Sequence, residues 1–185
     1  CRYLSTDEDR KVAIDSLRDV SIDDLLGREA VQLDWDSIRR ELYGKRVLVT
    51  GGGGSIGSEL CRQIARIGPE ALVLFEQSEF NLFEIERELR KAYPKLSLQV
   101  CLGDVTDAVL VNQVLAQYRP QVIFHAAAYK HVPMLEHQVR QAARNNVLGT
   151  RTLALAADRH GVEAFVMIST DKAVNPANVM GASKR

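Results

Sequence analysis

A run of four glycines at residues 51–54 constrains the fold of this 185-residue chain more than any other feature. It follows a short apolar segment and precedes an amphipathic one. With Gly57 the run fits two spacings, G-x-G-x-x-G and T-G-x-x-G-x-x-G, and the loop alone does not decide between them. Glycines here allow a tight turn and close approach to a pyrophosphate, which the N-terminus of the next helix attracts. The run predicts a dinucleotide-binding loop made of Gly51, Gly54, Ser55, Ile56 and Gly57.

After the loop, short apolar runs alternate with amphipathic segments. Near-continuous apolar runs are typical of parallel strands that are covered on both faces. Strands are predicted at residues 46–50, 71–76, 96–101, 122–126 and 164–169, and helices at 55–67, 78–93, 108–118 and 138–160. This order indicates right-handed βαβ units and an α/β fold with a Rossmann-like, doubly wound parallel sheet.

An acidic residue ends the second predicted strand. Glu76 lies 19 residues after Gly57, where a carboxylate can accept a hydrogen bond from the 2′-hydroxyl of an adenosine ribose. It would repel a 2′-phosphate, so NAD is favoured over NADP; the alternative is a solvated charge at a strand end. Asp104 and Val105 follow the third strand and are predicted to reach the adenine. The alternative for Asp104 is a turn or helix-capping acid.

The first 44 residues are a polar lead-in, interpreted as a linker or the tail of a preceding domain, with one helix predicted at 36–43. Residues 45–185 are interpreted as an NAD-binding domain that is incomplete at its C-terminal end, because a full doubly wound dinucleotide fold has six strands or more. Both ends are expected to be cut, with the substrate domain beyond Arg185. The chain alone is expected to bind NAD weakly and to be inactive.

Composition excludes several classes of partner. The chain carries 24 Lys+Arg and 24 Asp+Glu, and a net charge of zero argues against a nucleic-acid or anionic-membrane surface. No apolar run reaches the ~18 residues of a membrane span, so no membrane contact is expected from this segment. The cysteines form no C-x-x-C pair, no metal site is predicted, and a reduced, cytosolic setting is expected.

Polar and small residues follow the fourth predicted strand, at the sheet edge where ligands of open α/β sheets bind. Three small residues that let a dinucleotide pass close to the backbone come first: Ala126, Ala127 and Ala128. Three side chains that are predicted to face the reaction site come next: Tyr129, Lys130 and His131.

An acid and an amine, Asp171 and Lys172, follow the fifth strand. Such a pair can donate and accept protons, and the alternative is a salt bridge in a surface loop. Asn146, on the fourth predicted helix, either faces solvent or holds a water or a backbone carbonyl near the active site. Lys184 follows Met180 by four residues on one helix face, and it is predicted to hold the ribose hydroxyls of the nicotinamide.

These motifs together resemble the extended short-chain dehydrogenase/reductase superfamily. Within it the chain resembles the nucleotide-sugar 4,6-dehydratases of bacterial polysaccharide and glycan biosynthesis, from about residue 23 to residue 185. The specific segments are HAAAYKHVP at 125–133, STDKAVNP at 169–176 and NVMGASK at 178–184. Members usually carry Tyr-x-x-x-Lys, whereas this chain has Met180, which is similar to the long, membrane-anchored UDP-N-acetylglucosamine 4,6-dehydratases.

The resemblance implies a lyase reaction without net redox change, in which NAD accepts a hydride from sugar carbon C4 and returns it to C6 after water is lost. It implies that Asp171 is the acid at C6 and Lys172 the base at C5. Burial or a neighbouring Lys184 or Lys130 would have to lower the pKa of Lys172. Because Met180 replaces the tyrosine, Thr170 is the expected base for the C4 hydroxyl.

The resemblance also implies substrate contacts, a cellular location and an oligomeric state. The expected contacts to the UDP-sugar substrate come from Lys130, His131 and Asn175, and Asn146 and Lys184 are further cofactor-binding residues. It implies a cytoplasmic catalytic domain whose parent chain is anchored in the bacterial inner membrane. It also implies a homo-oligomer that pairs through the helices at 108–118 and 138–160.

Two other functions stay open at this point. One is a nucleotide-sugar 4-epimerase or reductase of the same fold, and the other is a catalytically silent NAD-binding regulatory module, which Met180 would suit. An epimerase needs no acid at C6, so the pair of Asp171 and Lys172 favours dehydration.

Overall fold

The computed structural model describes residues 34–185, and these contain one sheet of five parallel strands in the order β3-β2-β1-β4-β5. The strands are β1 (Arg46–Thr50), β2 (Ala71–Glu76), β3 (Leu98–Leu102), β4 (Val122–His125) and β5 (Ala164–Met167). The strand order reverses between β1 and β4, where doubly wound sheets bind their ligands. The predicted Rossmann-like fold is therefore confirmed.

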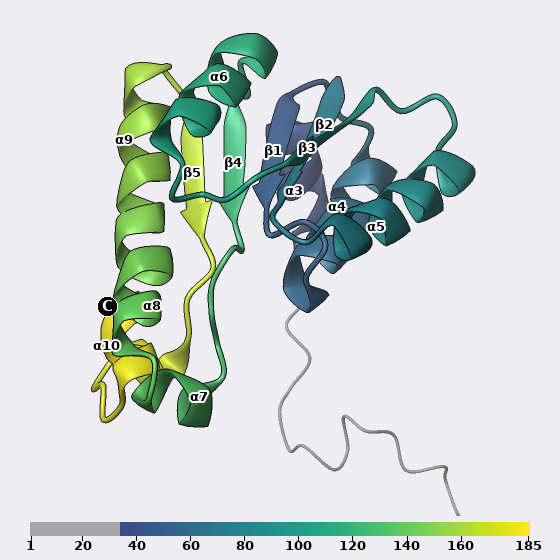
Figure 1. The fold of residues 1–185 in the computed structure, drawn as a ribbon. Coiled ribbons are helices and arrows are strands. Elements are labelled where there is room, and N and C mark those ends of the chain that lie inside the picture. The colour runs from purple at the N-terminus through teal and green to yellow at the C-terminus, as the bar shows by residue number, and fades with distance from the viewer. Residues whose placement is uncertain (1–33) are drawn as a thin grey trace, which may run out of the picture. The chain divides into compact units, whose positions relative to one another are not determined.

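Helices cover both faces of the sheet (Figure 1). They are α3 (Trp35–Leu42), α4 (Ser55–Ile67), α5 (Glu79–Ala92), α6 (Ala108–Tyr118), α7 (Val132–Glu136), α8 (Val139–Ala142), the π-helix η1 (Ala143–Gly149), α9 (Thr150–Arg159), the 3₁₀-helix η2 (Asp171–Ala173) and α10 (Val179–Lys184). In Figure 1, α7 and α10 lie beyond the arrowheads of β4 and β5, at the carboxyl edge of the sheet.

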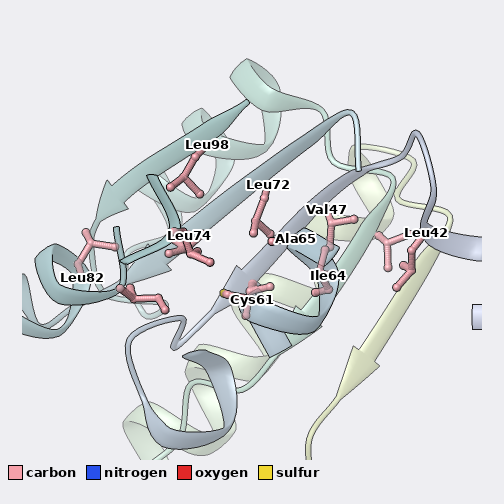
Figure 2. Close-up of a cluster of buried hydrophobic side chains, with 13 residues drawn as sticks. Leu42, Val47, Cys61, Ile64, Ala65, Leu72, Leu74, Leu82 and Leu98 are labelled. Carbon is pink, nitrogen blue, oxygen red and sulfur yellow. The ribbon is translucent and has the colours of Figure 1, made fainter. Parts of the chain in front are cut away.

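Alternate residues of the central strands point to two separate cores, which explains why the strands are apolar throughout. Val47 and Val49 face α4 and α5, in the cluster that Figure 2 shows. Leu48 between them faces the other way, and packs with Val73 and with buried residues of α6 and α9. Burial of both faces drives the helices onto the sheet.

The helix predicted at 36–43 is observed as α3, and Ile38 and Leu42 pack against the first of these cores. Residues Asp36–Arg185 form one compact unit. The interpretation of residues 1–33 as a linker or tail lies outside the described residues, and the domain boundary at residue 45 stays a prediction.

The predicted fourth helix, 138–160, is wrong as one continuous α-helix. The structure divides it into α8, η1 and α9, and it adds α7 and η2, which were not predicted. Apolar spacing locates the buried face of a helix, but it does not reveal where the hydrogen bonds widen from i→i−4 to i→i−5. The third strand begins at Leu98 rather than at residue 96, because the Leu96 N–H turns back to the Tyr93 carbonyl.

The glycine loop has no room for side chains at three positions, Gly51, Gly53 and Gly57, and the first and last of these pack on backbone within the site. Gly51 has a φ of +66°, and a Cβ on it would lie 2.7 Å from the backbone nitrogen of Ala127. A Cβ on Gly57, in the first turn of α4, would overlap the Gly51 carbonyl oxygen. The chain thus turns from β1 into α4 with backbone packed directly on backbone.

Gly57→Ala is expected to destabilise the protein by about 3 kcal/mol, because the new methyl group must displace backbone atoms. Gly161→Ala is the control: Gly161 also has a positive φ (+67°), but nothing lies within 4 Å of the added Cβ. Gly161→Ala should lower the free energy of unfolding by only about 1 kcal/mol. Urea unfolding of both variants measures the difference, and equal losses would contradict the packing argument.

Candidate dinucleotide-binding and catalytic site

A cavity opens at the carboxyl ends of the central strands. Seven of its lining residues were predicted to bind the cofactor: Gly51, Gly54, Glu76, Val105, Ala126, Ala127 and Ala128. Five others were not: Phe75, Gln77, Asn81, Gly103 and Asn145. The structure therefore brings five separate sequence segments around one space: the glycine loop, the end of β2 with the start of α5, the turn after β3, the alanines after β4, and Asn145 of η1.

The N-terminus of α4 lies at this cavity. Gly54 is its N-cap and provides no side chain to bond the first N–H groups of the helix. Ser55, Ile56 and Gly57 form its first turn, but they do not line the cavity themselves, and Ile56 is exposed. An uncapped N-terminus carries free donors and a partial positive charge, which suit the phosphates of a dinucleotide.

Glu76 is buried at the cavity wall, so its alternative interpretation as a solvated charge is wrong. One carboxylate oxygen accepts a hydrogen bond from the Gly53 N–H at 3.0 Å, and the other accepts one from the Ser78 N–H at 2.9 Å. Each oxygen retains a free lone pair. The carboxylate is thereby held in one orientation, and it is linked directly to the glycine loop.

Asp104 is a turn residue in this structure. Its Oδ1 accepts a hydrogen bond from the Thr106 N–H at 2.8 Å, and the next acid, Asp107, caps α6. Val105, not Asp104, lines the cavity. The turn interpretation of Asp104 is therefore confirmed, and contact with an adenine stays a prediction.

Asn146 does not face solvent, because it is 3% exposed on η1. Its amide oxygen accepts the Tyr129 N–H at 2.8 Å, and its amide nitrogen donates to the Tyr129 carbonyl and to Ser183 Oγ. The backbone-holding interpretation is the one observed. Asn145 donates to Asn146 at 3.0 Å and lines the cavity, a placement that the helical spacing could not reveal.

His125 is fully buried at the end of β4. Its Nδ1 lies 2.6 Å from Thr50 Oγ1 and its Nε2 lies 2.8 Å from Thr150 Oγ1. Burial, together with the nearby charge of Lys184, lowers the pKa of His125 to about 4. The imidazole is therefore neutral at pH 7, with one nitrogen that donates and one that accepts.

The acid–amine pair after β5 is exposed. Lys172 Nζ lies 3.3 Å from Asp171 Oδ1, which also accepts a hydrogen bond from Thr170 Oγ1 at 2.9 Å. That hydrogen bond, and then Lys172, lower the pKa of Asp171. The described residues thus form the surface ion pair that was the alternative interpretation, and they do not supply the burial on which a basic Lys172 would depend.

Helix α10 packs tightly on this pair. A Cβ on Gly181 would overlap the Lys172 carbonyl oxygen, so the two backbones are in contact. Lys184, one turn later, is buried, and burial lowers its pKa. Met180 is also buried, in an apolar cluster with Leu135 and Ala142. Its thioether fills a small core and offers no group that could transfer a proton.

The predicted substrate contacts occupy the outer side of the site. Lys130 and His131 are exposed and line a second hollow together with Tyr129, Met134 and Leu135. Asn175 is exposed in the loop that follows η2. Within residues 34–185, no three His, Cys, Asp or Glu side chains gather as metal ligands would, and no helix is long and apolar enough to cross a bilayer.

The fold and the glycine-loop cavity define a Rossmann-like protein of the short-chain dehydrogenase/reductase type. The structure of Pen from Bacillus thuringiensis matches with a TM-score of 0.72 at 29% identity, over 77% of this chain and 44% of that one. The UDP-glucose 4-epimerase of Bifidobacterium longum, solved in complex with NAD+ and UDP, shares the fold with a TM-score of 0.66 at 21% identity, over 75% of this chain and 45% of that one.

Residues 47–185 match the family described as polysaccharide biosynthesis protein, and the chain belongs to that family. It is 45% identical to the capsular polysaccharide biosynthesis protein CapD of Staphylococcus aureus, over 95% of this chain and 29% of CapD. It is 48% identical to the probable polysaccharide biosynthesis protein EpsC of Bacillus subtilis, over 91% of this chain and 28% of EpsC. The chain therefore spans less than a third of either relative.

A more distant relative is named for a reaction. The UDP-N-acetylglucosamine 4,6-dehydratase (inverting) of Campylobacter jejuni is 30% identical, over 76% of this chain and 41% of that protein.

Burial of neutral His125 predicts a specific loss of stability in acid. The ordinary pKa of 6.5 falls to about 4 on folding, so between these values the unfolded chain binds a proton that the folded chain does not. Stability should therefore fall as the pH falls through this window, by about 3 kcal/mol in total.

Urea unfolding at several pH values measures how the free energy of unfolding depends on pH. His125→Gln should lose the fall in unfolding free energy between pH 6.5 and about 4, whereas His137→Gln, at an exposed position, should keep it. Equal slopes in the wild type and His125→Gln would show that His125 does not titrate as a buried neutral group.

Proposed function

We propose that this chain is the NAD-binding part of a nucleotide-sugar 4,6-dehydratase that acts on UDP-N-acetylglucosamine. The observation that carries the proposal is that one sheet edge holds both the cavity beside the glycine loop and the segment with Thr170, Asp171 and Lys172. The name of the Campylobacter relative supports the reaction, and the names of CapD and EpsC support a role in polysaccharide synthesis.

The cavity suits NAD on its own chemistry. Gly51 and Gly54 leave the backbone open at the uncapped start of α4, where a pyrophosphate finds N–H donors. Glu76 has lone pairs left for ribose hydroxyls, and its negative charge opposes the 2′-phosphate of NADP. When bound, NAD would supply a reversible hydride acceptor, so the dehydration needs no external oxidant.

The chain's own residues would move the protons. Thr170 Oγ1, with Lys184 or a water, would take the proton of the C4 hydroxyl. Lys172 would remove the C5 proton, and Asp171 would protonate the C6 hydroxyl, which leaves as water. A hydride would then add to C6 and a proton to C5, and the proton from the C4 hydroxyl would restore Asp171, so the sugar loses one water overall with no net change in oxidation state.

The ion pair of Asp171 and Lys172 must change for these roles. A lowered pKa keeps Asp171 ionised, whereas an acid at C6 must be protonated. We infer that a bound sugar removes water from the pair. Desolvation destabilises the charged forms of both side chains, so a proton can pass from Lys172 to Asp171. Lys172 then becomes the neutral base and Asp171 the neutral acid.

An epimerase of the same fold is the competing function, as the Bifidobacterium structure illustrates. It would exchange the configuration at C4 and would release no water. A silent NAD-binding module, which buried Met180 would suit, would bind NAD and convert no sugar. We further propose that the parent protein is membrane-anchored and acts as a homo-oligomer on the cytoplasmic side.

The intact protein, saturated with NAD, is expected to convert UDP-N-acetylglucosamine in D₂O into a 4-keto-6-deoxy sugar with deuterium at C5. Lys172→Met should lower the rate by about a hundredfold or more, because the C5 base is lost. Lys95→Met, an exposed lysine beyond α5, is the control and should keep the wild-type rate. Mass spectrometry and NMR of the product follow both the water loss and the label.

Unchanged dehydration by Lys172→Met would reject Lys172 as the base at C5. Two results would reject the dehydratase itself: a C4 epimer without water loss, or no product from a protein that binds NAD. The first would establish the epimerase, and the second would establish the silent module.

Glu76→Gln is expected to narrow the preference for NAD over NADP by roughly tenfold, because it removes the charge and keeps a carbonyl acceptor. Fluorescence titration with both reduced cofactors measures the ratio of the two dissociation constants. Glu79→Gln, an exposed neighbour, should leave that ratio unchanged. If Glu76→Gln also leaves it unchanged, Glu76 does not select the cofactor.

A further inference from the structure

Three polar side chains form a bridge behind the cavity. His125 lies in the middle, with hydrogen bonds of 2.6 Å to Thr50 and 2.8 Å to Thr150. Thr50 and His125 are completely buried and Thr150 is half-buried. None of the three is among the described residues that line the cavity. The bridge therefore cannot contact a ligand there, and its effect must pass through its neighbours.

Each member of the bridge adjoins a wall of the cavity. Thr50 ends β1 and precedes Gly51 of the glycine loop. His125 ends β4 and precedes the alanines, beginning at Ala126. Thr150 opens α9 directly after η1, which carries Asn145. The two hydrogen bonds thus join three cavity walls, although Thr50 and Thr150 lie 100 residues apart in the sequence.

The walls have little freedom to shift independently. A Cβ on Gly51 would lie 2.7 Å from the Ala127 nitrogen, and a Cβ on Gly149 would lie 2.8 Å from Val105 Cγ2. The glycine loop thus touches the alanine segment, and the end of η1 touches another lining residue. In close-packed interiors a displacement at one such contact is passed to the next.

Both hydrogen bonds of the bridge can have a donor and an acceptor at the same time. A hydroxyl can donate and accept, and a neutral imidazole does one at each nitrogen, so the chain of bonds is satisfied in either direction. Replacement of Thr150 by valine leaves a buried imidazole nitrogen without a partner, while serine restores one. A buried group left unpaired is costly, which makes this pair of variants a sensitive probe.

We propose that His125 is a positioning residue, and that the Thr50–His125–Thr150 bridge couples the start of α9 to the glycine loop and so sets the width of the dinucleotide cavity. Its consequence for NAD binding rests on the proposed function. The coupling itself does not, because it can be measured in the protein without ligand.

The first measurement is hydrogen–deuterium exchange of the intact protein without cofactor. Thr150→Val should raise the exchange of glycine-loop amides at 51–57 by roughly tenfold, although the substitution is on α9. Thr150→Ser should match the wild type, and amides of β2 serve as the reference for global loosening. If the loop keeps its wild-type exchange, or if β2 loosens equally, the coupling is refuted.

Thr50→Val and Thr50→Ser test the bridge from its other end. The valine variant should raise exchange at 143–153, around the start of α9, and the serine variant should not. These variants also decide the matter if Thr150→Val does not fold, since unchanged exchange at 143–153 would again refute the coupling.

The second measurement is NAD affinity. Thr150→Val should weaken it by roughly tenfold, and Thr150→Ser by less than about twofold. Altered loop exchange with unchanged affinity would overturn the claim that the bridge sets the cavity width. If even the wild type does not bind NAD, while the exchange results hold, the proposed function fails and the coupling stands.

Discussion

The site depends on the contact between backbone and backbone where β1 turns into α4. No side chain fits on Gly51 or Gly57, because Ala127 and the Gly51 carbonyl occupy that space. The turn brings the N-terminus of a 13-residue helix to the carboxyl end of the central strand. It also places the Gly53 N–H against Glu76. Without that contact neither the N–H donors of α4 nor the carboxylate of Glu76 would be held at the cavity.

Buried polar groups are concentrated on one side of this molecule. The described residues include six of them: Thr50, Glu76, His125, Asn145, Asn146 and Lys184. All six lie at or beyond the carboxyl ends of the strands, while the two cores between sheet and helices are apolar. Burying polar groups costs free energy unless they are paired, and among the described residues no buried side-chain nitrogen or oxygen lacks a hydrogen-bond partner. A cluster of paired polar groups at one edge of a sheet is typical of a functional site.

The sequence predicts the fold better than it predicts the site. Apolar periodicity and the glycine run locate every strand of the described sheet, because burial on two faces leaves a strong signal. The same periodicity misses η1 and therefore the exact direction of Asn145 and Asn146. It identifies His125 only as part of a motif, since pairing with Thr50 and Thr150 arises from tertiary structure. The exposure of Asp171 likewise depends on what packs around it, which local sequence does not encode.

The two halves of the proposed site, one for the cofactor and one for catalysis, are preorganised to different degrees. On the proposed cofactor side, Glu76 and Asn146 already have the partners that fix them, so little ordering remains to be done on binding. On the proposed catalytic side, Asp171 and Lys172 form an exposed ion pair whose charges are the reverse of those that the proposed acid and base require. Desolvation by a substrate would correct that arrangement only when a sugar is in place. A site built in this way would hold NAD between turnovers and would acquire its acid and its base together with the substrate.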